Sequence, residues 1–168
     1  MLGELLTEAR EYCEEQTAAS LITTTWEMTF DRFPRSDRFY LPRWPLKSIE
    51  ALTYIDAAGA TQALDLNTIS ARVDHAGQGR IVRKSYASWP ETQTTPDSVK
   101  ITFKAGFGDD PQSVPTTWKR AIKMLVAWWF EQRETAVVGT ITNSVPVGLE
   151  ALLESAGTAG LVPFDLGE

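Results

Sequence analysis

The stretch AREYCEEQTAASLITTTWEMTFD, from Ala9 to Asp31, changes its hydrophobic period from that of a helix to that of a strand. Up to about Thr17, apolar residues recur at intervals of three and four, which is typical of an amphipathic helix. From Leu21 onward, apolar and polar residues alternate, and the β-branched and aromatic content favours a strand. The helix extends back to the start of the chain, where its apolar stripe comprises Leu2, Leu5, Leu6, Ala9, Tyr12 and Cys13.

Short strands separated by turns are expected after this change of period. Residues 34–37 predict a turn, and Arg38–Leu41 is then expected to return as the second strand of a hairpin. Pro42 and Pro45 end that strand, because proline cannot donate a hydrogen bond to a ladder. Further strands are predicted at residues 48–56, 61–64, 68–73, 80–83 and 98–105, with turns at 57–60 and 74–79.

A second, stronger helical pattern begins at Pro115, a residue that suits the first helical position. Its apolar stripe is unusually wide, which predicts two buried contacts, one within the subunit and one with a neighbour. The main face carries Trp118, Ala121, Ile122, Leu125, Trp129 and Gln132, with Met124 and Trp128 beside it. We therefore take Met124, Trp128 and Trp129 as candidate interface residues.

The order of elements predicts an α+β fold. It comprises an N-terminal helix, an antiparallel meander of short strands, a long C-terminal helix, a short helix opened by Pro146, and an extended tail. The short helix places Leu149, Leu152 and Leu153 on one face. A chain of 168 residues has the size of one domain, so we expect a single domain over 1–155 and a C-terminal arm over 156–168.

Charge is distributed unevenly along the chain. The total of 16 basic and 22 acidic residues gives −6, which argues against a basic footprint for sequence-specific DNA binding. Residues 1–15 carry five glutamates against one arginine, and residues 150–168 carry four acids and no base. Residues 31–47 carry five bases against two acids. The asymmetry suggests charge-complementary contacts between copies or with partners, and a merely solubilising surface is the alternative.

Several classes of protein are disfavoured by composition. The apolar runs at residues 124–127 and 128–130 fall short of the ~20 residues that a transmembrane helix needs, so no membrane partner is expected. No signal-peptide pattern opens the sequence. The single cysteine, Cys13, cannot form an internal disulfide and is expected to be a small buried hydrophobe.

Catalytic patterns are weak. His75 is the only histidine and lies in a predicted turn without a nucleophile or second ligand beside it. The segment Gly106-Phe107-Gly108-Asp109-Asp110 lacks the remaining residues of a dinucleotide or phosphate-binding motif. Its adjacent aspartates suit a hard cation, but a strand-to-helix turn is the favoured interpretation. No catalytic, cofactor-binding or metal-binding residue is assigned.

Six tryptophans are many for this length. Trp44 and Trp89 lie in predicted loops near the bases of Arg32–Arg43, where they would suit the stacking of single-stranded nucleic acid. Anchoring of a core or an interface is the favoured account, because the other tryptophans include Trp26, Trp118 and Trp129 on predicted core stripes.

Several segments, read together, carry a family resemblance. They are the helix Ala9–Thr17 running into Leu21–Trp26, Phe30–Pro34, the proline-bracketed link Leu41–Ile49, Val99–Gly108 followed by Val114-Pro115 and Trp118–Ile122, Trp129–Glu134, Val145–Leu149, and Leu152-Leu153. In combination these segments resemble the head–tail connector family (adaptor, or head-completion proteins) of long-tailed bacteriophages and prophages. The resemblance covers about Thr7 to Leu153.

The resemblance implies a virion structural protein and no enzymatic activity. It implies a homo-oligomeric ring of about twelve copies between the portal and the tail-side neck or tail-terminator protein. DNA would pass through the centre without specific binding. The implied location is the neck of the virion, after assembly in the host cytoplasm.

The C-terminal arm is the expected attachment to the portal, as the resemblance implies for this family. Leu161, Val162, Phe164 and Leu166 are its candidate anchors, because a short extended peptide can add to a sheet edge or fill a groove. The alternative is a tail folded over its own subunit. Two other functions stay open: a monomeric nucleic-acid-binding module, and a small metal-dependent hydrolase using Asp109 and Asp110.

Overall fold

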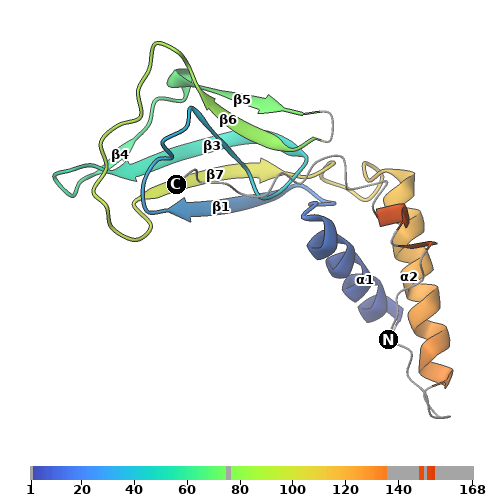
Figure 1. Cartoon of the computed structure of the whole chain (residues 1–168). Helices are drawn as coiled ribbons and strands as arrows, with labels where there is room; N and C mark the ends of the chain where they lie inside the picture. Colours follow the sequence, from blue (N-terminus) through green and yellow to red (C-terminus); the bar gives the residue numbers. More distant parts are fainter. Residues whose placement is uncertain (1, 75–76, 136–147, 150, 154–168) are drawn as a thin grey trace.

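The computed structural model describes residues 2–74, 77–135, 148–149 and 151–153. Figure 1 shows a body of two stacked sheets with a pair of helices at one end. The helices are α1 (Leu2–Thr17) and α2 (Thr116–Thr135), and the strands are β1 (Thr24–Phe30), β2 (Arg38–Tyr40), β3 (Leu46–Ile55), β4 (Thr61–Ala63), β5 (Ile69–Val73), β6 (Gly79–Arg83) and β7 (Val99–Ala105). A 3₁₀ turn, η1 (Leu66–Thr68), precedes β5. The predicted α+β class and the order of its elements are confirmed.

The strands divide into two antiparallel sheets. One has the order β1-β7-β3-β4 and the other β2-β6-β5. The expected hairpins of β3 with β4 and of β5 with β6 are present. Because β7 lies between β1 and β3, the last strand in sequence holds the first sheet together, and the strand order differs from that of a sequential meander.

The predicted hairpin between the first strand and Arg38–Leu41 is wrong. β2 pairs with β6, with Phe39 opposite Ile81, and the backbone N–H of Leu41 donates to the carbonyl of Gly79. The reason is burial: residues 31–37 cross from one sheet to the other, which places both Phe33 and Phe39 in the core between the sheets. A tight two-residue turn would have left these rings without that partner sheet.

A hydrophobic core fills the space between the sheets. In β7 the inward residues Val99, Ile101, Phe103 and Ala105 are fully buried. Alternate residues face outward, where Lys100 pairs with Glu27 at 3.0 Å and Lys104 pairs with Glu50 at 3.4 Å. This period-two burial is the pattern that the sequence predicted for a strand with one face in the core.

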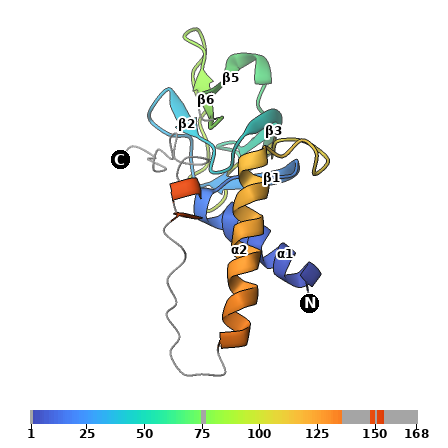
Figure 2. The ribbon, with the colours of Figure 1, turned by 90° about the vertical axis from the view of Figure 1, so that its right-hand side faces the viewer.

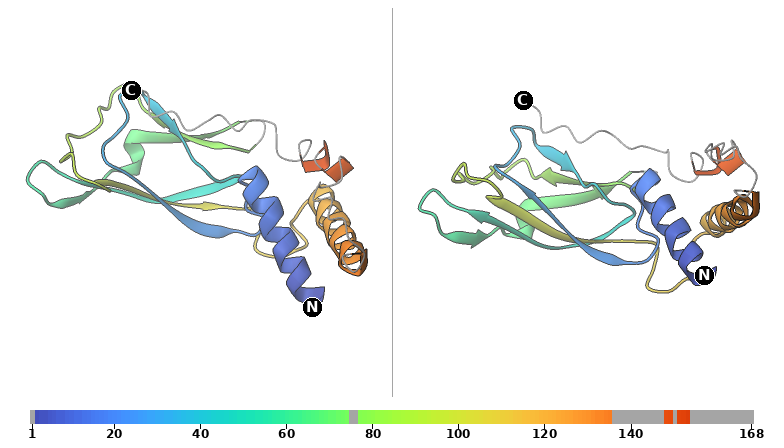
Figure 3. Two further views of the ribbon diagram at one scale, coloured as in Figure 1. Left: turned by 60° about the horizontal axis from the view of Figure 1, so that its bottom comes forward. Right: turned by 90° about the horizontal axis from the view of Figure 1, so that it is seen from below.

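A second core lies at the helical end. α1 and α2 lie side by side, as Figure 3 shows from two directions, and the ring of Tyr12 meets that of Trp129 edge-on at 6.0 Å. The predicted short helix is helical at residues 148–149 and 151–153, with Leu149 and Leu153 buried against the same core and Leu152 half-buried. Pro146 and the tail at 156–168 lie outside the described residues.

Candidate functional site

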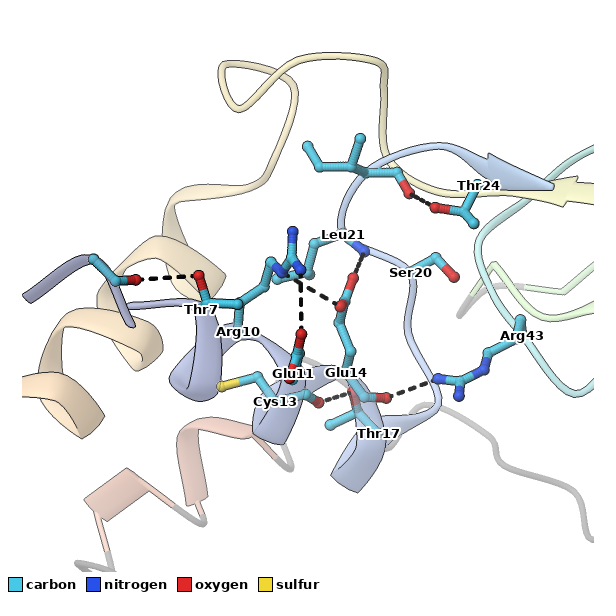
Figure 4. A network of polar contacts seen from close by, with 12 residues as sticks. Thr7, Arg10, Glu11, Cys13, Glu14, Thr17, Ser20, Leu21, Thr24 and Arg43 are labelled. Carbon is cyan, nitrogen blue, oxygen red and sulfur yellow. Dashed lines mark hydrogen bonds and ion pairs between the residues drawn. The ribbon is translucent and has the colours of Figure 1, made fainter. Parts of the chain in front are cut away.

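The junction between α1 and the sheets is fixed by a network of polar contacts, drawn in Figure 4. The Glu14 carboxylate accepts the backbone N–H of Leu21 at 2.7 Å and lies 3.7 Å from Arg10. The guanidinium of Arg43 donates to the backbone carbonyl of Glu14 at 3.1 Å and covers the ring of Trp26 at 4.4 Å. These contacts hold the end of α1 against the start of the β1 segment and the link between β2 and β3.

Trp44 is part of this junction and is buried. Its indole N–H donates to the carbonyl of Thr17 at 2.7 Å, and its ring packs against Trp118 and Phe107. Trp89 stacks on Phe33 with ring centroids 4.8 Å apart. Both rings are therefore engaged within the subunit, which favours the core-anchoring interpretation over the stacking of nucleic-acid bases.

The Asp109-Asp110 segment forms a turn before α2. The Asp110 carboxylate accepts the backbone N–H groups of Gln112 at 2.7 Å and Ser113 at 3.2 Å. Across the part of the chain that the structure describes, no group of three His, Cys, Asp or Glu side chains is placed to hold a metal ion. The Asp110 carboxylate thus has a structural use as a turn acceptor, and His75 lies outside the described residues.

Cys13 has the environment of a packing residue. Its side chain is fully buried between the helices, as the apolar stripe predicted. Burial, together with the neighbouring charge of Glu14, raises the pKa of the Cys13 thiol to about 11. A thiol with so high a pKa is neutral at physiological pH and is a poor nucleophile.

An apolar groove runs between α1 and α2, and we call it the α1–α2 groove. Two adjoining hollows of about 380 and 650 Å³ share Leu6 and Lys123 in their walls. Leu2 is 66% exposed, Leu6 53% and Phe130 44%. The remaining walls include Gly3, Thr7, Arg10, Ile122, Val126, Ala127 and Glu131. Large apolar side chains exposed together in this way mark a surface that contacts another molecule.

The groove was not recognised in the sequence. Leu2 and Leu6 fall within the predicted apolar stripe of α1, yet only the line Leu5, Ala9 and Cys13 is buried. The wide stripe of α2 predicted three interface residues. These are Met124, Trp128 and Trp129, and each is half-buried against the subunit's own core. Their role as interface residues stays a prediction, whereas Phe130, on the flank of α2 that faces the groove, is the more exposed side chain.

The described residues thus present features that are typical of a contact surface. They combine an open apolar groove, a helix pair locked to the sheets, and an outer sheet face with cross-strand ion pairs. No helix in the described part of the chain has the length and apolar character needed to span a bilayer. These features favour a protein that works by assembling with others.

Comparisons with known proteins agree with this class. No protein-family model and no curated protein matches the chain. Among solved structures, the chain is similar to one from the neck of an empty gene transfer agent (GTA) particle computed with C6 symmetry. The two share 28% identity and a TM-score of 0.74, over 93% of this chain and 76% of the other.

Two further structures give the same result. A chain from the virion of the native GTA particle shares 25% identity at a TM-score of 0.73, over 92% of this chain and 75% of the other. A chain from the neck of the native GTA particle, computed with C12 symmetry, shares 25% identity at a TM-score of 0.71. This match covers 92% of this chain and 80% of the other. These similarities support a structural protein of a phage-like virion neck.

Proposed function

We propose that the chain forms the connector ring of a phage-like neck, between the portal and the tail-side neck or tail-terminator protein. The observation that carries the proposal is similarity over 93% of the chain to a component of a GTA neck. The neck structures were computed with C6 and C12 symmetry, and a ring of twelve copies satisfies both. The protein acts structurally and not as an enzyme.

A closed ring needs two different patches on each copy, because head-to-tail contacts join one patch to another on the next subunit. The α1–α2 groove supplies one apolar patch. The charge asymmetry supplies complementary surfaces. Along α1, Glu4, Glu8, Glu11 and Glu15 are exposed, whereas Arg32 and Arg35 are exposed in the β1–β2 link and Arg38 at the start of β2. Met124, Trp128 and Trp129 border the subunit core and keep part of their surface for a neighbour.

DNA passage through the ring is compatible with the charge of the chain. A net charge of −6 gives no general affinity for a polyanion, because non-specific DNA binding is supplied by cationic contacts. A channel that binds DNA weakly lets it slide. The protein would reside in the virion neck after assembly in the host cytoplasm.

The C-terminal residues 156–168 are proposed as an arm on the 1–155 domain that attaches the ring to the portal. The support is compositional: Leu161, Val162, Phe164 and Leu166 lie close together in a short acidic segment. Exposure of these four side chains to water gives no stabilisation. Burial of each one in a partner contributes about 1.5–3 kcal/mol to binding, less the free-energy cost of ordering the arm.

The mass of the assembly, measured with and without portal particles, tests this function. The full chain should add about twelve subunit masses to each portal ring. Binding of a single copy, or no binding to portal at all, would overturn the proposal. Salt-dependent DNA binding by the isolated monomer, with no portal association, would instead favour the nucleic-acid-binding alternative.

A further inference from the structure

The α1–α2 groove has an open apolar wall but no occupant within the described residues of the subunit. Ile122, Val126 and Phe130 are spaced by four residues and so form one line along α2. Leu2 and Leu6 face them from α1. Burying such a wall requires a chain segment that is itself apolar and uncharged, because the charges of Arg10, Lys123 and Glu131 at its margin are best left in water.

One segment of the chain has this composition. Residues 136–147 read AVVGTITNSVPV, with no charged residue and five valine or isoleucine side chains. The acidic tail, in contrast, carries Asp165 and Glu168. The composition of 136–147 therefore matches the apolar groove better than the tail does.

The ends of this segment are placed by the structure. It starts after Thr135 at the end of α2 and rejoins the described chain at Gly148, next to the buried Leu149. Twelve residues reach about 40 Å when extended, whereas the whole of α2 is only about 30 Å long. The segment thus has about 10 Å or more of surplus length, which allows its middle to extend beyond its own subunit.

The two flanks of α2 are different. Figure 2 shows the N-terminal half of α1 on one side of α2 and the helical residues 148–149 and 151–153 on the other. Along α2, Val126 and Phe130 border the groove, whereas Met124 and Trp128 lie about half a helical turn away. A segment that filled the groove of its own subunit would then have to cross the exposed side of α2 to rejoin the chain at Gly148. A segment that enters the groove of a neighbouring copy does not have to cross its own α2.

We propose that residues 136–147 of one copy lie in the α1–α2 groove of the adjacent copy. This inference rests on the proposed ring and specifies its heterologous contact: the groove is the receiving patch, and the segment after α2 is the donated one. Repeated around the ring, each copy donates one segment and receives one, so no groove stays open when the ring closes.

Cysteine cross-linking between differently tagged copies tests the contact. One copy carries Leu6→Cys or Phe130→Cys, and the other carries Val138→Cys, Ile141→Cys or Val145→Cys; both are full chains co-assembled on portal particles and then oxidised. The native Cys13 is buried and is the same in every sample. We expect disulfide-linked pairs of the two tags for at least one combination, since a disulfide needs Cα atoms within about 7 Å.

Two matched controls define the result. Tyr86→Cys, at a side chain 75% exposed and outside the groove, should give no pair with Ile141→Cys. Val162→Cys in the tail should give none with Phe130→Cys. Cross-links from the tail, or intact rings without any groove cross-link between the two tags, would each overturn the inference and leave the proposed ring standing. Absence of rings with the unmodified chain would instead contradict the proposed function.

A charge placed in the groove gives an independent readout. Phe130→Asp should reduce the yield of rings at least tenfold while the unfolding midpoint of the isolated subunit stays within error, because this ring is 44% exposed there. Tyr86→Asp introduces the same charge outside the groove and should leave ring yield unchanged. Equal yields from the two variants would contradict the proposed contact.

Discussion

The indole N–H of Trp44 donates a hydrogen bond of 2.7 Å to the carbonyl oxygen of Thr17. Thr17 is the last residue of α1, and Trp44 lies in the link between β2 and β3, so this one bond joins the helical end of the molecule to its sheets. Next to it, the backbone N–H of Ser20 donates to the carbonyl of Trp44 at 2.8 Å. The position of α1, and with it one wall of the groove, depends on this junction.

Trp44→Phe should destabilise the subunit by about 1–3 kcal/mol, because it leaves the buried carbonyl of Thr17 without its donor. Trp89→Phe is the matched control: its indole bond to the Ser36 carbonyl, at 3.0 Å, lies at an exposed site where water can replace it. Its cost should stay below about 1 kcal/mol. Denaturant unfolding of the isolated subunits measures both, and equal costs would contradict the role assigned to Trp44.

Replacement of glycine by alanine should have opposite effects on the stability of the subunit at Gly106 and at Gly3. Gly106 has φ of 148°, and a Cβ there would lie 2.5 Å from the backbone of Thr23, so Gly106→Ala should cost more than about 2 kcal/mol. Gly3 lies in α1 with open space around it, so Gly3→Ala should stabilise the subunit by about 0.5–1 kcal/mol through helix propensity. Thermal unfolding of the two variants tests the pair, and the same sign for both would be inconsistent with the structure.

Sequence patterns predicted elements better than they predicted partners. The alternation in Val99–Ala105 and the helical spacing around Trp118 identify their elements, because burial follows the period of each backbone. The partner of β2 was missed, because Phe39 pairs with Ile81 in β6, which is distant in the sequence, and no local turn signal encodes that contact. Long-range burial decided the pairing.

In the candidate site, too, the sequence pattern predicted the elements but not their contacts. An apolar stripe indicates that a helix face is covered but not by what, so Leu6 and Leu5 are equivalent in the pattern although one is 53% and the other 2% exposed. Trp44 lies between two prolines and has the sequence context of a loop, yet it is 5% exposed because it anchors the end of α1. Whether an apolar residue belongs to the core or to an exposed surface is decided by its neighbours in the fold and not by its spacing in the sequence.

The contribution of the Cys13 thiol to the stability of the subunit should be lost at alkaline pH. Its pKa is raised from 9.0 to about 11 in the folded chain, so the thiol keeps its proton there after the unfolded chain has lost it. The stabilisation is complete below pH 9 and declines as the pH rises from 9 to 11. The difference in unfolding free energy between the native chain and Cys13→Ala should shrink over that interval. A difference independent of pH would contradict the assigned environment.

The C-terminal arm predicts a separation of folding from attachment. A chain ending at Ser155 should unfold at the same denaturant concentration as the full chain but lose portal binding, as measured by co-sedimentation with portal particles. Replacement of Leu161, Val162, Phe164 and Leu166 by serine in the full-length chain should have the same effect without changing the length. Undiminished portal binding by both variants would assign the portal contact to the domain itself.

Ring formation in the neck of a phage-like particle can be observed by electron cryo-microscopy of assembled necks, reconstructed without imposed symmetry. We expect about twelve copies of this chain in a closed ring between the portal and the tail-side proteins, related by head-to-tail contacts. A neck that contains a single copy of the chain, or none, would contradict this expectation.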